Sequence, residues 1–223
     1  MDNILLLIKF FKEKEFADRL LNMGQVYFNV ATFYNESTNK EQGDSNEGAE
    51  WIDNTPIVNV KVTHPTIGTF EFKPVTTSPS KVIQYNYYYL SFSLFALTSD
   101  LFDKNGSYKM NSSMSEFGDT AIVIEDHNKF LTALTKELKN RNIKYEVKSV
   151  NYRDLSNGRV ELTPFDKKQE HQHQRELRVI IENTENKPKS IDIGSIAEYS
   201  KIVRSCLLTE STLNFERQTN DKS

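Results

Sequence analysis

The chain has 223 residues, of which 37% are hydrophobic, 11% aromatic and 26% charged. This is enough apolar material for one core, whereas its longest apolar run, residues 4–8, is far shorter than the ~20 residues of a transmembrane helix. The formal net charge of −3 gives no overall attraction to nucleic acid or anionic lipid. We therefore expect one domain over residues 1–215, a polar tail over 216–223, and neither membrane nor nucleic acid as a partner.

Cysteine usage and the N-terminus both favour the cytoplasm. Cys206 is the one cysteine, so no internal disulfide can form, which fits a reducing compartment. The opening Met-Asp-Asn lacks the basic start of a secretory signal. Apolar neighbours on both sides of Cys206 predict a buried, unreactive thiol.

The first thirty residues predict a strand, a helix and a second strand. Residues 4–11 form a short apolar block typical of a buried strand, and residues 25–30 alternate as a strand does. Between them, residues 12–23 have helical spacing, and Gly24 is a natural C-terminal stop. The apolar face of this helix is predicted to contain Phe16, Leu20, Leu21 and Met23.

The next segments predict loops and strands. Residues 35–50 are polar, acidic and glycine-containing, which indicates a surface loop, and loops of this length are often functional. Residues 57–72 predict a β-hairpin that turns around His64. Residues 82–97 are rich in aromatic side chains and predict one strand, followed by a second long loop over 98–116.

The C-terminal half predicts one helix and several strands. Residues 121–124 are a short apolar strand, and Asp126 stands where the N-cap of a helix is expected. Further strands are predicted at 144–152, 176–181, 190–193 and 201–208. The buried face of the helix is predicted to contain Phe130, Leu131, Leu134 and Leu138. The chain as a whole predicts an α+β domain with a mixed or antiparallel split sheet and a few short helices.

Several short phrases, taken in order, resemble an uncharacterised family of bacterial and phage proteins. They are VYFN, which ends at Asn29, then GDSNEG, YYYLSFSL, FGDTAIVI, VNY, PFDKK and HQRELRVII. This family has a Gly-Asp-x-x-Glu-Gly loop, a Phe-Gly-Asp entry to a buried strand and a Gln-x-Glu-x-Arg strand. The matching residues are Gly43, Asp44, Glu47, Gly48, Lys167, Gln174, Glu176 and Arg178.

The order of the opening elements also resembles the start of the ADP-ribosyltransferase fold, in which a split sheet binds a dinucleotide and a glutamate on a late strand acts on the ribose. This resemblance implies NAD as the bound molecule, Glu176 as the catalytic residue and Lys9 and Arg178 near the phosphates. The chain departs from the family at two places. Lys9 stands where Arg or His is usual, and no Ser-Thr-Ser element is recognisable, although Ser91 and Ser93 lie two residues apart.

The Gln-x-Glu-x-Arg segment carries the strongest candidate site. Residues two apart on a strand share a face, so Gln174, Glu176 and Arg178 are predicted to point one way while Leu177 and Val179 face the core. A carboxylate between an amide and a guanidinium suits a ribose hydroxyl or a developing cation. A structural ion pair is the alternative interpretation of the same residues.

The glycine-flanked loop at 43–48 is a second candidate. Asp44 and Glu47 suit contacts with a ribose, whereas the spacing does not follow a calcium loop. A solvated turn is the alternative. His171 and His173 lack further ligands at a recognisable spacing, so no metal is expected. The aromatic run at 85–95 is interpreted as core and not as a base-stacking platform.

These patterns favour a nucleotide-binding protein, NAD-dependent and ADP-ribosyltransferase-like, that acts in phage–host conflict. Its catalytic residue would be Glu176, and its binding residues Lys9, Asn29, Asp44, Glu47, Gln174 and Arg178. The alternative is a non-enzymatic binding or inhibitor module that grips a protein or a nucleotide. A homo-oligomer is compatible with either interpretation.

Overall fold

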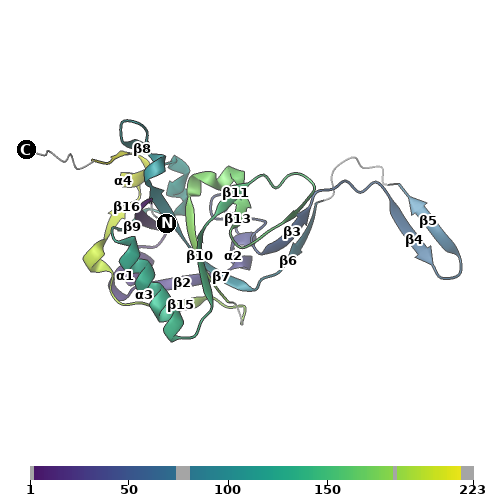
Figure 1. The fold of residues 1–223 in the computed structure, drawn as a ribbon, viewed down its shortest axis with the longest axis horizontal. Helices are drawn as coiled ribbons and strands as arrows, with labels where there is room; N and C mark the ends of the chain where they lie inside the picture. Colours follow the sequence, from purple (N-terminus) through teal and green to yellow (C-terminus); the bar gives the residue numbers. More distant parts are fainter. Residues whose placement is uncertain (1–2, 74–80, 183–184, 217–223) are drawn as a thin grey trace, which may run out of the picture.

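The computed structural model describes residues 3–73, 81–182 and 185–216. They form a mixed α+β fold whose strands are mostly antiparallel and whose helices are few and short (Figure 1). The α+β class predicted from the sequence is therefore confirmed. The predicted tail over 216–223 lies, apart from Glu216, outside the described residues.

The largest sheet forms the body of the molecule. Its main path runs through β10 (Tyr145–Ser149), β14 (Glu176–Glu182), β7 (Tyr89–Thr98), β1 (Ile4–Phe11), β9 (Thr120–Ile124) and β16 (Ser200–Arg204). Two further strands, β2 (Gln25–Val30) and β15 (Lys189–Asp192), join it because β2 pairs with both β15 and β7.

The sheet is split along one edge of β7. The other edge of β7 pairs with β14 continuously from Tyr89 to Phe95. On the split edge, β1 pairs only with residues 95–98 and β2 only with Leu90 and Ser91. Between these two contacts, residues 92–94 have no partner among the described strands on this edge. β1 and β2 therefore diverge and leave an opening in the sheet.

Helices α1 (Lys14–Met23) and α3 (His127–Asn140) cover one face of the sheet (Figure 1). The predicted cap of α3 is confirmed, since Asp126 accepts a hydrogen bond from the backbone N–H of Lys129 at 2.9 Å. Its buried residues are Phe130, Leu134 and Leu138, and Leu131 is partly buried. This face holds the larger core, because apolar residues from both helices pack on alternate residues of β7 and β14 and on Ile4 and Leu7 of β1.

The apolar face predicted for α1 is partly wrong. Ala17 and Leu20 are its buried residues, whereas Phe16 and Met23 are about half exposed. The end of the helix is as predicted, because Gly24 adopts φ 65° and its N–H bonds to the Leu20 carbonyl at 2.9 Å. Only glycine fits there, since a Cβ would lie 2.0 Å from the Gly194 carbonyl oxygen.

A second apolar cluster covers part of the opposite face. It includes Ile8 and Phe95 from the sheet together with Met110, Met114 and Leu208. The loop predicted over 98–116 supplies part of this cover, and it contains the short strand β8 (Ser107–Lys109) and two 3₁₀ helices, η1 (Ser99–Leu101) and η2 (Ser112–Phe117). β8 pairs with β17 (Thr212–Asn214). The rest of this face contains the buried polar residues Ser91, Glu176 and Arg178 and a small apolar cluster around Tyr89 and Ile180.

Three single strands predicted from the sequence are each divided in the structure. Residues 82–97 form β6 (Val82–Tyr85) and most of β7, separated by residues 86–88. Residues 144–152 form β10 and β11 (Asn151–Arg153), because the Asn151 N–H turns away to bond Phe165. Residues 201–208 form β16 and then one turn of helix, α4 (Cys206–Thr209), in which Leu208 bonds back to Ser205. Cys206 is partly exposed, not buried as predicted.

Smaller strands and helices surround the part of the opposite face that contains Ser91, Glu176 and Arg178. β6 pairs with β3 (Ala49–Asp53), which pairs in turn with β12 (Arg159–Glu161), and β11 lies parallel to β13 (Asp166–Lys168). The remaining short helices are α2 (Ala31–Asn35), η3 (Gln169–Gln174) and η4 (Ala197–Tyr199).

The hairpin predicted at 57–72 is confirmed. It consists of β4 (Val60–His64) and β5 (Gly68–Phe72), and it projects away from the body as an arm (Figure 1). Every residue of both strands is exposed.

Candidate functional site

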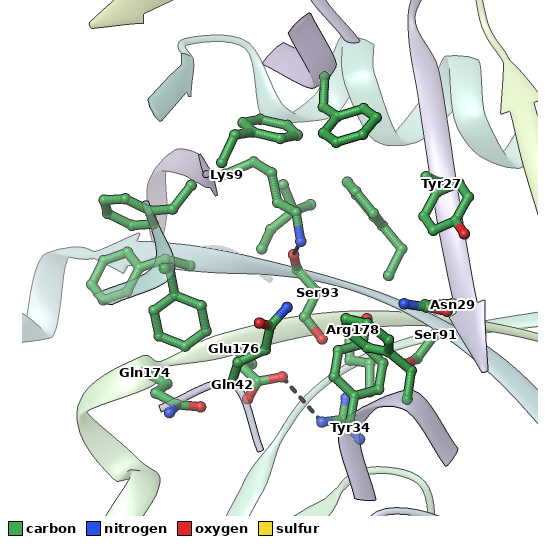
Figure 2. A pocket seen from close by; sticks show the side chains of 18 of the residues that line it. Lys9, Tyr27, Asn29, Tyr34, Gln42, Ser91, Ser93, Gln174, Glu176 and Arg178 are labelled. Atoms are coloured by element: carbon green, nitrogen blue, oxygen red, sulfur yellow. Dashed lines mark hydrogen bonds and ion pairs between the residues drawn. The ribbon is translucent and has the colours of Figure 1, made fainter. Parts of the chain in front are cut away.

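A cavity of about 800 Å³ lies at the split in the sheet. It is lined by residues of α1 and of the loop after α2, and by Lys9 on β1, Asn29 on β2, Ser93 on β7 and Glu176 on β14 (Figure 2). Its volume is in the range of small-molecule sites in proteins. All seven candidate residues named from the sequence line this one cavity: Lys9, Asn29, Asp44, Glu47, Gln174, Glu176 and Arg178.

The Glu176 carboxylate is held by two cations. One oxygen is 2.6 Å from Lys167 Nζ, and the other is 3.1 Å from Arg178 Nη2, an ion pair drawn in Figure 2. Burial alone would raise the pKa of Glu176, but Lys167 and Arg178 outweigh it and hold that pKa well below its usual range. Ser93 adds a hydrogen bond. At neutral pH Glu176 is therefore an ionised carboxylate at the wall of the cavity.

Arg178 links Glu176 to the glycine-flanked loop. Its Nη1 is 3.1 Å from Glu47 Oε1 and donates to the Pro164 carbonyl at 2.5 Å. Burial raises the pKa of Glu47 above its usual value, and Arg178 offsets this only partly. The Tyr89 hydroxyl donates to the same Glu47 oxygen at 2.8 Å. The structure thus contains the ion-pair network that was the alternative interpretation of these residues, and it places the network on the wall of a cavity.

The segment 43–48 is not a solvated turn, so that interpretation of the sequence is wrong. Asp44, Asn46 and Glu47 are all buried. Asp44 accepts a hydrogen bond from the Asn46 N–H at 2.9 Å, and the Gly48 N–H donates to the Tyr89 hydroxyl at 3.1 Å. The loop folds inward because its acidic side chains find donors there.

Gln174 reaches the cavity by a route that the strand pattern does not predict. It ends the 3₁₀ helix η3, and Arg175 takes a left-handed conformation with φ 42° before β14 begins at Glu176. Its side-chain oxygen accepts from Lys167 Nζ at 2.6 Å, and its amide nitrogen donates to Glu41. Gln174 therefore supports Lys167 from outside the strand.

Lys9 stands at the split itself. Its Nζ donates to the Ser93 carbonyl at 2.8 Å, a group on the stretch of β7 left unpaired by β1 and β2, and it lies 4.8 Å from the centre of the Phe92 ring. Burial lowers the pKa of Lys9 to about 8, against the opposing effect of Glu176. Lys9 thus takes the place of a strand partner, and with a pKa of about 8 it is still mostly protonated at pH 7.

Several lining residues were not selected from the sequence. Tyr34 bonds to Ser91 through their side chains, and burial together with Glu47 raises the pKa of its hydroxyl. Gln42 and the aromatic residues Phe16, Tyr27 and Phe33 also line the cavity. Aromatic residues on the three successive elements α1, β2 and α2 could have indicated an aromatic lining, but the sequence pattern assigned Phe16 to the core.

Neither histidine of η3 is among the described residues that line the cavity. Within the described residues, no group of three or more His, Cys, Asp or Glu side chains is arranged to hold a metal ion. His173 Nε2 lies 2.6 Å from Glu41, and His171 Nδ1 lies 3.3 Å from Gln174. His173 therefore joins η3 to the loop after α2, whereas the contact of His171 lies within η3.

No protein-family model, curated protein or solved structure matches the chain. In the part of the chain that the structure describes, no helix has the length and apolar character needed to cross a membrane.

Proposed function

We propose that the protein binds a nucleotide, NAD in the first instance, in the cavity at the split sheet and acts as an ADP-ribosyltransferase-like enzyme in the cytoplasm, in phage–host conflict. One observation carries the proposal: β1 and β2 diverge along β7 beside an ionised glutamate on the adjacent strand. The resemblance of the opening elements to the ADP-ribosyltransferase fold supports the choice of reaction, and that of the ordered motifs to bacterial and phage proteins supports the setting.

The charge state of Glu176 suits a particular role. A carboxylate whose pKa is held well below the usual range is a weak base but a permanent negative charge. In transfer from NAD, the bond between the ribose C1′ and the nicotinamide nitrogen breaks, and its electron pair leaves with nicotinamide. Positive charge develops on the ribose, and Glu176 stabilises it while accepting a hydrogen bond from a ribose hydroxyl. The acceptor nucleophile then bonds to C1′ and releases its proton.

The supporting residues would keep this carboxylate in place. Lys167 and Arg178 each hold one oxygen of Glu176, which fixes its orientation and leaves the remaining lone pairs for a ligand. Lys9 lines the same cavity, with its Nζ held by the Ser93 carbonyl. The roughly 800 Å³ cavity has room for a ligand of this class.

The test measures binding and turnover separately. NAD and a panel of other nucleotides are titrated into the wild type and Glu176→Gln by calorimetry, and release of nicotinamide is followed with time. We expect Glu176→Gln to remove turnover while NAD still binds. Glu182→Gln is the matched control, because Glu182 is an exposed glutamate at the end of the same strand. Full turnover in Glu176→Gln would contradict the proposal.

A non-enzymatic binding or inhibitor module is the second candidate, and the β4–β5 arm favours it. The arm exposes apolar side chains without packing them on the body, as a surface that contacts a protein partner does. Demonstrated turnover of any nucleotide by the purified protein would count decisively against this candidate.

A further inference from the structure

Two carboxamides in the cavity have no partner for their donor groups among the residues that the structure describes. Asn29 Oδ1 accepts from the Val30 N–H at 2.9 Å, which leaves its Nδ2 unpaired among the described residues. The Gln42 side chain makes no hydrogen bond within the described ranges, although its backbone N–H bonds to Asn39. Figure 2 shows both amides directed into the space between Lys9 and Tyr34. Asn29 is 9% exposed, so its free donor is oriented by the fold toward the cavity and not toward bulk water.

Aromatic rings surround the mouth of the same cavity. Phe16 on α1, Tyr27 on β2 and Phe33 on α2 line it and remain 52%, 50% and 45% exposed. Large side chains of this kind are normally buried, and contributions from three separate elements make a chance arrangement of surface residues a poor explanation. Aromatic faces of this type stack on planar rings.

The charges of the floor are already neutralised, which disfavours a phosphate there. Lys167 is bonded to Glu176 and Gln174, and Arg178 to Glu176 and Glu47. Lys9 is the remaining floor cation, and a backbone carbonyl already occupies it. A phosphate clamp presents free donors of positive charge, whereas this floor presents amides and a carboxylate.

We infer that the floor binds a planar heteroaromatic ring by its edge, with Asn29 and Gln42 pairing to a donor beside an acceptor on that ring and the aromatic mouth stacking on its face. This inference rests on the proposed function and specifies which part of the nucleotide lies deepest. Nicotinamide carries such an edge in its carboxamide, and a nucleobase carries it in its ring and exocyclic groups. Asn and Gln suit either source, because a carboxamide both donates and accepts.

The experiment uses fragments to separate these sources from phosphate. Nicotinamide, adenosine, uridine and inorganic pyrophosphate are each titrated into the full-length protein by calorimetry. Asn29→Asp keeps the oxygen that accepts from Val30 and removes the free donor, and Gln42→Ala removes the second amide. Gln84→Ala, on the exposed part of β6, is the matched control. We expect at least one ring fragment to bind the wild type and the control equally, and to bind each site variant about tenfold or more weakly.

The outcomes separate this inference from the proposed function. Ring fragments that bind both variants as tightly as the wild type, or pyrophosphate as the one probe that binds, would overturn the edge recognition. If NAD is still turned over with Glu176 dependence in those variants, the proposed function stands and the inference fails. If no fragment and no nucleotide binds the wild type, both fail. Preference for nicotinamide over adenosine and uridine, or the reverse, identifies the ring.

Discussion

The cavity wall and the β4–β5 arm both depart from the usual distribution of side chains. The wall buries charged residues, whereas the arm exposes apolar ones. The wall buries four charged residues, Lys167, Glu176, Arg178 and Glu47, in one network. The arm is amphipathic, because cross-strand pairing places apolar residues on one face and the Lys61–Glu71 ion pair on the other. Its apolar face is nevertheless exposed to solvent, and consists of Val60, Val62, Phe70 and Phe72.

The two regions differ in how far each depends on the rest of the fold. The wall joins β13, β14 and the loop after α2, so its charges are satisfied only when these segments are assembled. The arm bonds within itself, through backbone pairing and contacts such as Thr63–Thr69 at 3.0 Å. A buried charge that loses its partner lowers the stability of the fold strongly, whereas exposed apolar groups add little to the stability of the body. Stability alone therefore explains neither the buried charges of the wall nor the exposed apolar residues of the arm.

The largest expected effect comes from breaking the wall. Arg178→Met keeps a long side chain but leaves Glu47 and Glu176 without their shared cation. Removing one partner of a buried pair costs about 3–5 kcal/mol in the free energy of unfolding, measured by urea denaturation. Arg141→Met is the control, since Arg141 pairs with Glu137 on the surface of α3 and should leave the midpoint nearly unchanged. Equal midpoints for the two variants would show that the network contributes nothing.

A comparable loss of unfolding free energy is expected when a phenylalanine of the core is replaced by alanine, but not when one of the arm is. Phe130→Ala removes a ring with 0% exposure and should cost about 3–5 kcal/mol. Phe70→Ala makes the same chemical change at a ring that is 49% exposed, and should shift the unfolding free energy by about 0.5 kcal/mol or less. Thermal and urea unfolding of both variants check the difference. A large loss at Phe70 would mean that the arm packs on the body in solution.

A smaller effect, dependent on pH, is expected at Lys9. Its pKa falls from 10.5 to about 8 in the folded state, so between these values the unfolded chain binds more protons than the folded one. The stability of the wild type should therefore rise with pH from about 8 to 10.5, relative to Lys9→Met, which lacks the group. Below about pH 8 the difference between the two proteins should be constant. A parallel pH profile for both across this window would contradict a buried Lys9.

Local patterns predicted the elements that depend on neighbouring residues. The β1–α1–β2 order, the Asp126 cap, the Gly24 stop and the hairpin at 57–72 all follow from spacing, capping and turn chemistry within a few residues. For two of the predicted strands that are divided, a partner distant in the sequence decided the outcome. Residues 82–97 and 144–152 each look like one strand, but they are divided because their two halves pair with different sheets.

The sequence by itself determined the α+β class and named seven of the polar residues that line the cavity, because these residues lie in short polar motifs that can be recognised locally. Only the tertiary structure decided that β1 and β2 separate along β7, that the loop at 43–48 turns inward, and that Phe16 faces the cavity mouth instead of the core. The physical reason is that strand divergence and the burial of a charge depend on partners from segments far apart in the chain. The spacing of residues within one segment does not reveal which distant segments will be those partners.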